Sequence, residues 1–116
     1  MHIRTALGSW GEELVSQHLK EKGYTIVALN YRCRYGEIDI IASKQDLITC
    51  VEVKTRSKEY FATSVVITTS KQKKIIKTAK LFLQKQNISD VSCRFDVATV
   101  TRKNSAISYI ENAFYG

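Results

Sequence analysis

The 116-residue sequence contains no proline, and no stretch of it has the composition of a flexible linker. It also lacks internal repeats and apolar runs of 18 residues, which argues against a repeat array and a membrane-spanning helix. The three cysteines are widely spaced and form no CxxC pair, so neither a zinc ribbon nor a thiol redox motif is indicated. We therefore expect a single compact domain over residues 1–116.

Acidic residues are scarce relative to basic ones: 11 Asp and Glu face 18 Lys and Arg, which gives a net charge of +7. Such a balance favours a polyanionic partner, most simply nucleic acid, although it also suits a surface whose charge serves solubility. No secretory signal is recognisable, so we expect a cytoplasmic protein with reduced thiols and no membrane association. Cys50 and Cys93 lie in apolar, strand-like runs and are expected to be small core residues.

The spacing of apolar residues predicts seven elements in the order α-β-β-β-α-β-β. Helical periodicity predicts helices over 4–22 and 70–86. Runs rich in Val, Ile and Tyr predict strands at 24–31, on both sides of a polar turn at 43–46, at 93–102 and at 106–110. Residues 57–69 show no clean period and are expected to form either a mobile flap over substrate or a connecting loop with a short strand at 65–67. This order predicts an α/β fold with a central mixed β-sheet flanked by helices.

Charged residues interrupt the two apolar strands within 36–56. Asp39 lies among isoleucines, Glu52 lies between Val51 and Val53, and Lys54 follows. Alternation along a strand puts Glu52 and Lys54 on one face, roughly 7 Å apart, and a paired strand would bring Asp39 within about 4.8 Å of their strand. Carboxylates are costly to bury unless they are paired or bind a metal. A magnesium ion, which prefers oxygen ligands, would satisfy this cluster.

Three further acidic residues have two interpretations each. Ser9 and Glu12 have the spacing of a helix capping box, but Glu12 could equally deliver a third carboxylate to the cluster. Glu37 either orients a basic neighbour or lines the site. Asp96, inside a predicted strand, either pairs with Arg94 or serves as an accessory residue of the site.

Basic residues concentrate in two segments. The helix predicted over 70–86 carries six lysines and no acidic residue, which favours a phosphate-binding face over a merely solvated one. The segment 30–36 interleaves arginines with tyrosines, a combination that can grip phosphates and stack on bases or simply form a solvated turn. The candidate nucleic-acid-binding residues are Arg32, Arg34, Arg56, Lys71, Lys73, Lys74 and Lys77.

Taken together, the charged motifs resemble those of the YraN-like family of small bacterial proteins. The resemblance rests on four motifs in order: Gly11-Glu12, Gly36-Glu37-Ile38-Asp39, Val51-Glu52-Val53-Lys54 and Arg94-Phe95-Asp96. That family is assigned to the restriction-endonuclease-like superfamily of PD-(D/E)XK nucleases and is similar to archaeal Holliday-junction resolvases. The resemblance implies a restriction-endonuclease-like fold and a homodimer worth testing.

The resemblance also implies roles for individual residues. Asp39 and Glu52 would hold Mg²⁺ or Mn²⁺, with the carbonyl oxygen of Val53 as a further ligand. Glu12 would hold the same ion or a second one through water. Lys54 would orient the attacking water or neutralise developing charge. The implied activity is metal-dependent hydrolysis of phosphodiester bonds in DNA, with branched DNA as a candidate substrate.

The alternative is a nucleic-acid-binding or adaptor module that keeps a nuclease scaffold without turnover, because fold does not fix function. Such a module would bind through the lysines of the second helix, with a strong dependence on salt. Its binding would respond little to substitution of Asp39.

Overall fold

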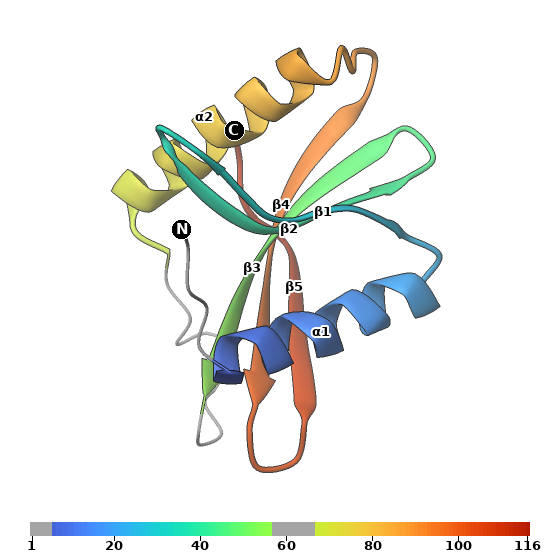
Figure 1. Ribbon diagram of the computed structural model, residues 1–116, viewed down its shortest axis with the longest axis vertical. Coiled ribbons are helices and arrows are strands. Elements are labelled where there is room, and N and C mark those ends of the chain that lie inside the picture. The colour runs from blue at the N-terminus through green and yellow to red at the C-terminus, as the bar shows by residue number, and fades with distance from the viewer. Residues whose placement is uncertain (1–5, 57–66) are drawn as a thin grey trace.

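The computed structural model describes residues 6–56 and 67–116 and confirms the predicted order of elements (Figure 1). The helices are α1 (Ala6–Glu21) and α2 (Thr69–Lys85). The strands are β1 (Thr25–Cys33), β2 (Gly36–Lys44), β3 (Leu47–Arg56), β4 (Ser92–Thr101) and β5 (Ala106–Phe114). None of the helices in the described ranges is long and apolar enough to cross a membrane.

The five strands form one mixed sheet in the order β1-β2-β3-β4-β5. Strands β1 to β3 are an antiparallel meander, β3 and β4 are parallel, and β5 returns antiparallel to β4. A parallel pair requires a long crossover, and α2 lies in the connection between β3 and β4. The mixed sheet expected from the sequence is therefore confirmed.

The two helices cover opposite faces of the sheet and define two hydrophobic clusters (Figure 1). The cluster beneath α2 contains Ile38, Ile41, Ile48, Cys50, Ile67, Ile75, Ala79, Phe82, Phe95, Val97 and Phe114. The cluster beneath α1 contains Val15, Leu19, Ile40, Ala42, Val51, Ala98 and Val100. Because the inner strands are buried on both faces, they read as nearly continuous apolar runs.

The capping-box interpretation within α1 is wrong, and α2 begins slightly earlier than predicted. Helix α1 begins at Ala6, so Ser9 lies inside the helix and the capping-box interpretation of Ser9 and Glu12 fails. Helix α2 begins one residue before Ser70, and the side chain of Thr68 accepts a hydrogen bond from the Lys71 amide at 3.2 Å. Threonine is a favoured N-cap residue, so Thr68 fixes the start of α2.

The strands near the C-terminal end also differ from expectation. Cys50 is buried, as predicted, but Cys93 is exposed near the start of β4, where the strand extends past the core. Strand β5 continues beyond Ile110 to Phe114, which packs beneath α2. The expected loop at 57–69 lies mostly outside the described residues.

Gly11 lets α1 pack closely against β3. A Cβ atom added there would collide with Thr55 Oγ1 and lie 3.6 Å from Val53 Cγ1. We expect Gly11→Ala to lower the free energy of unfolding by about 1–3 kcal/mol, because overpacking outweighs alanine's better helix propensity. Urea denaturation should show this loss, whereas Glu13→Ala at an exposed position of the same helix should change stability little. A stabilised Gly11→Ala protein would contradict the packing argument.

Candidate active site

Asp39 lies where the pairing between β2 and β3 ends. The register of these strands runs from Lys44↔Leu47 to Ile40↔Val51. At the next position a side-chain contact replaces the main-chain pairing: Asp39 Oδ2 accepts a hydrogen bond from the Val53 amide at 2.8 Å. Regular alternation also breaks here: Ile38 packs beneath α2, whereas Ile40 packs beneath α1. The carboxylate thus sits between the two strands, at the point where main-chain pairing gives way to a side-chain contact.

Glu52 and Lys54 project toward α2, on the same face as Cys50. The Glu52 side chain is buried, with 6% of its area exposed, and its Oε2 lies 3.2 Å from the Lys71 ammonium. Lys71 belongs to the first turn of α2, so the helix start delivers a cation to the acidic residues. Phosphate binding by Lys71 stays a prediction; the structure places its ammonium against the Glu52 carboxylate.

Glu12 approaches from α1, where it is buried, and its Oε1 accepts a hydrogen bond from Asn30 Nδ2 at 3.1 Å. Asn30 lies on β1 between Leu29 and Tyr31, whose partners on β2 flank Asp39. Asn30 adopts a φ of 51°, a conformation that asparagine tolerates better than most residues. Sequence reasoning missed Asn30; its signal is a polar residue in the middle of a strand.

Three carboxylates influence one another at this point. Burial raises the pKa of Asp39 to about 7, and the negative charges of Glu52 and Glu12 and a hydrogen bond shared with Glu52 add to the rise. The Val53 amide opposes the shift because it donates to the ionised form. An acidic group that holds its proton near neutral pH beside other carboxylates is a frequent property of functional sites.

The pKa values of Lys54 and Lys71 are shifted in opposite directions. Burial lowers the pKa of Lys54, and a hydrogen bond with Lys71 and its positive charge lower it further. Burial is the largest single effect on Lys71 and works against its charged form, but the charge of Glu52, hydrogen bonds with Lys54 and Glu52, and the charge of Asp39 together outweigh it and raise the pKa of Lys71. Lys54 is therefore the lysine that gives up its proton more readily, while Lys71 remains the counter-ion of Glu52.

The donor set suits a divalent cation with oxygen ligands. The Asp39 and Glu52 carboxyl groups are close enough to share a hydrogen bond, and their mutual repulsion is relieved by a proton or by a cation between them. Among the described residues, no three Asp, Glu, His or Cys side chains form a group that could hold an ion by themselves. Mg²⁺ is commonly bound by one or two carboxylates and keeps several waters, so two carboxylates fit its requirements.

The remaining candidates lie around this cluster. Glu37 Oε2 lies 3.1 Å from Arg32 Nε, which favours the interpretation that Glu37 orients a basic neighbour. Arg56 is half-buried at the end of β3. The other predicted phosphate-binding side chains are exposed on the β1–β2 turn and on α2: Arg34, Lys73, Lys74 and Lys77.

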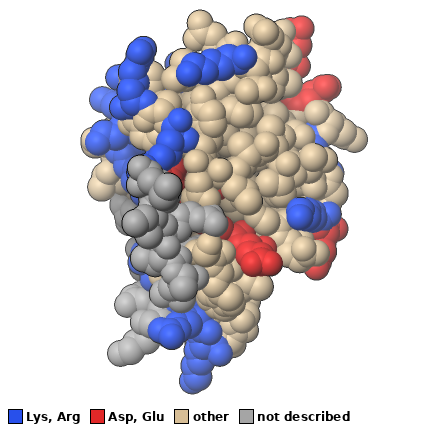
Figure 2. Space-filling model, in the orientation of Figure 1, with Lys and Arg blue, Asp and Glu red and all other residues tan. Residues whose placement is uncertain are grey.

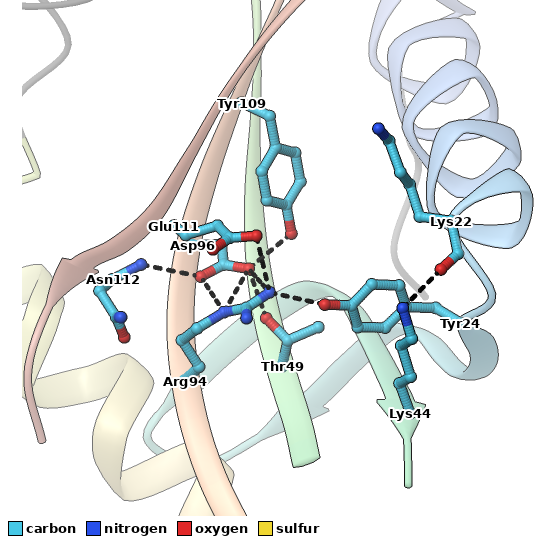
Figure 3. A network of polar contacts seen from close by, with 9 residues as sticks. All are labelled: Lys22, Tyr24, Lys44, Thr49, Arg94, Asp96, Tyr109, Glu111 and Asn112. Atoms are coloured by element: carbon cyan, nitrogen blue, oxygen red, sulfur yellow. Dashed lines mark hydrogen bonds and ion pairs between the residues drawn. The ribbon is translucent and has the colours of Figure 1, made fainter.

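Asp96 is buried in a separate polar network on β4 (Figure 3). Its carboxylate accepts hydrogen bonds from Thr49 Oγ1 at 2.7 Å, Tyr109 Oη at 2.6 Å and the Asn112 amide at 3.0 Å. The Arg94 guanidinium donates to both carboxylate oxygens, at 2.9 Å and 3.1 Å from Nε. These partners come from β3, β4 and β5, so Asp96 pairs with Arg94 and joins three strands.

The comparison with known proteins supplies a family. A family model described as "Uncharacterised protein family UPF0102" matches residues 11–100. The chain belongs to the UPF0102 family. Glu12, Asp39 and Glu52 form what we call the acidic cluster, with Lys54 and Lys71 beside it. The matched range includes all five residues.

Individual UPF0102 proteins match along nearly their whole length. A UPF0102 protein of Alkaliphilus metalliredigens is 40% identical over 111 residues, which cover 94% of this chain and 97% of that protein. One from Clostridium botulinum (strain Loch Maree / Type A3) is 42% identical over 114 residues, with 93% of each chain covered. One from Syntrophus aciditrophicus is 41% identical over 116 residues, covering 97% and 90%.

Proposed function

We propose that this UPF0102 protein is a metal-dependent nuclease of the PD-(D/E)XK type that hydrolyses phosphodiester bonds in DNA. The observation that carries the proposal is the meeting of Asp39 and Glu52 from adjacent strands with the half-buried amine of Lys54. Strand positions 39, 52 and 54 match the D and (D/E)XK elements of the resemblance described above. The mixed sheet with a helix on each face is the architecture which that superfamily would require.

The surroundings of each residue in the acidic cluster favour one role in the proposed reaction. Asp39 and Glu52 would hold Mg²⁺ or Mn²⁺, with the Val53 carbonyl as a further oxygen ligand and Glu12 in reach through water. The chemistry that the ion supplies when bound is neutralisation of phosphate charge and activation of a water molecule. The lowered pKa of Lys54 makes its neutral amine more accessible than that of an ordinary lysine, which would suit a role in orienting the attacking water.

The charged surface supports a polyanionic substrate. Figure 2 shows lysine and arginine side chains gathered over α2, while most acidic side chains in this view lie away from it. The helix carries no acidic residue between Thr69 and Lys85. Because α2 begins beside the acidic cluster, a DNA backbone that follows these lysines would bring a phosphate to Asp39 and Glu52. Branched DNA is the substrate form that we expect to be preferred.

The decisive test is cleavage of a substrate panel by the wild-type protein. Four-way junctions, flaps, single strands and duplexes should be incubated with Mg²⁺ or Mn²⁺, with EDTA as the blank. We expect metal-dependent products that Glu52→Gln abolishes and that Lys54→Met reduces by at least about 100-fold. Lys103→Met, at an exposed position, serves as the matched control. Binding of every substrate without cleavage in either metal would contradict hydrolysis and leave the non-catalytic binding module.

A further inference from the structure

A groove between the β1–β2 turn and α2 lies outside the acidic cluster. It is lined by Arg34, Tyr35, Lys77, Lys80, Leu81 and Gln84 and is an open groove with a volume of about 280 Å³. Tyr35 forms its aromatic surface: the Arg34 guanidinium lies 4.9 Å from the ring centroid and the Lys77 ammonium 5.7 Å. The Arg34 Nη2 also donates to Tyr35 Oη at 2.9 Å, which holds the turn and the ring together.

The lining combines one aromatic ring, three cations and an amide in a space near the lower limit of small-molecule sites. A double helix cannot enter such a volume, and an apolar ligand would leave the cations unmatched. A single nucleotide matches both features, because its base has a π-face and its phosphate is anionic. Stacking of bases on aromatic side chains within a basic groove is the usual mode of single-strand binding.

We propose that this groove binds one unpaired nucleotide of a DNA strand, with the base against Tyr35 and the phosphate between Lys77 and Lys80. The proposal rests on the proposed function, whose substrate it specifies. Lys71 at the acidic cluster and Lys80 at the groove are nine positions apart on α2, or about 14 Å along the helix axis. A strand cut at Asp39 and Glu52 would thus have an unpaired nucleotide a few positions from the scissile phosphate.

This arrangement selects DNA in which paired and unpaired segments meet, such as flaps, gaps and junctions with a frayed arm. A generic basic surface would instead bind duplexes as well as single strands, and the tyrosine ring would contribute nothing. Dependence of single-strand binding on the Tyr35 ring therefore distinguishes a nucleotide-binding groove from a generic basic surface.

The test measures binding in EDTA, where no hydrolysis interferes. A labelled 12-nucleotide single strand and the matching duplex are titrated at fixed salt with wild-type protein, Tyr35→Leu and Tyr35→Phe. We expect Tyr35→Leu to weaken single-strand binding about 5- to 100-fold and duplex binding less than about 2-fold. Tyr35→Phe, which keeps the ring, should stay near wild type, and Tyr115→Leu at a highly exposed tyrosine is the matched control.

A second readout follows the base itself. A strand carrying 2-aminopurine should lose fluorescence on binding to wild type and Tyr35→Phe, but not to Tyr35→Leu. Equal weakening of single-strand and duplex binding, or none, would overturn the proposal, as would tighter binding of the same sequence in RNA. If the wild type cleaves DNA while Tyr35→Leu binds single strands normally, the proposal for the groove is refuted and the proposed nuclease function is retained. Ring-dependent binding without any cleavage would refute the nuclease alone.

Discussion

Replacing Asp39 by asparagine is expected to reduce metal-dependent cleavage by more than about 1,000-fold, since several kcal/mol of charge stabilisation at the phosphate would disappear with the metal site. Asparagine keeps the shape of the side chain and an oxygen that can accept from the Val53 amide. Binding of DNA should therefore survive, within about 3-fold of wild type, when measured in Ca²⁺ or EDTA. Cleavage retained by Asp39→Asn would refute the assignment of the ion to this carboxylate.

The same substitution is expected to stabilise the metal-free protein. Because the folded protein raises the pKa of Asp39 from 3.8 to about 7, its carboxyl group favours folding in the protonated form. The free energy of unfolding should accordingly fall as the pH rises from about 4 through 7 and level off above. The full shift would correspond to about 4 kcal/mol, and sharing the proton with Glu52 reduces the expected gain to about 2 kcal/mol at pH 8.

Thermal unfolding at pH 5.5 and 8.0 checks this expectation. Asp39→Asn should show a higher melting temperature than wild type at pH 8.0 and a weaker dependence on pH. Asp46→Asn makes the same chemical change in an exposed turn and should leave both quantities unchanged. Mg²⁺ should raise the melting temperature of wild type but not of Asp39→Asn, since a ligand stabilises the state that binds it. A destabilised Asp39→Asn protein would show that the carboxylate is structural.

Asp96→Ala should lower the free energy of unfolding by about 3–5 kcal/mol, the usual cost of removing one partner of a buried ion pair. The variant would leave the Arg94 guanidinium, with 15% of its side chain exposed, without its buried carboxylate partner. Thr49 and Tyr109 would lose their acceptor at the same time. The midpoint of thermal unfolding should fall by on the order of 15 °C.

Glu111→Ala provides the matched control for Asp96→Ala. Its carboxylate is also an Arg94 partner, at 3.7 Å, but it is largely exposed. An exposed pair contributes little, so Glu111→Ala should change stability by less than about 1 kcal/mol. Equal losses from the two variants would contradict the importance of burial in this network.

The fold was largely predictable because apolar periodicity reports burial directly. The helices and five strands appear in the expected order, and the apolar stripes identify the faces that pack. The capping-box interpretation of Ser9 and Glu12 failed because that pattern also occurs inside a helix, where Glu12 serves a tertiary contact instead. Cys93 was misplaced because the pattern of a strand does not reveal where the strand passes the edge of the core.

The acidic cluster was predictable in its members but not in its surroundings. Charged residues within apolar strands are unusual, and this made Asp39, Glu52 and Lys54 conspicuous. Asn30 was not assigned to the site, and Lys71 was assigned to phosphate binding but not to the contact with Glu52. The first contact spans 18 residues of sequence and the second joins a strand to a helix start. Such contacts follow from the register of strands and the entry of α2, which no local pattern encodes.

The order of synthesis of this chain bears on its aggregation before folding is complete. Glu12, Asp39, Glu52 and Lys54 all precede the crossover, whereas β4, which pairs with β3 over its whole length, follows α2. Until β4 is synthesised, β3 presents an open edge of unpaired amides and carbonyls, the kind of edge that joins other chains. Nascent chains stalled between Arg56 and Ser92 would carry every acidic residue of the cluster and still be prone to aggregate.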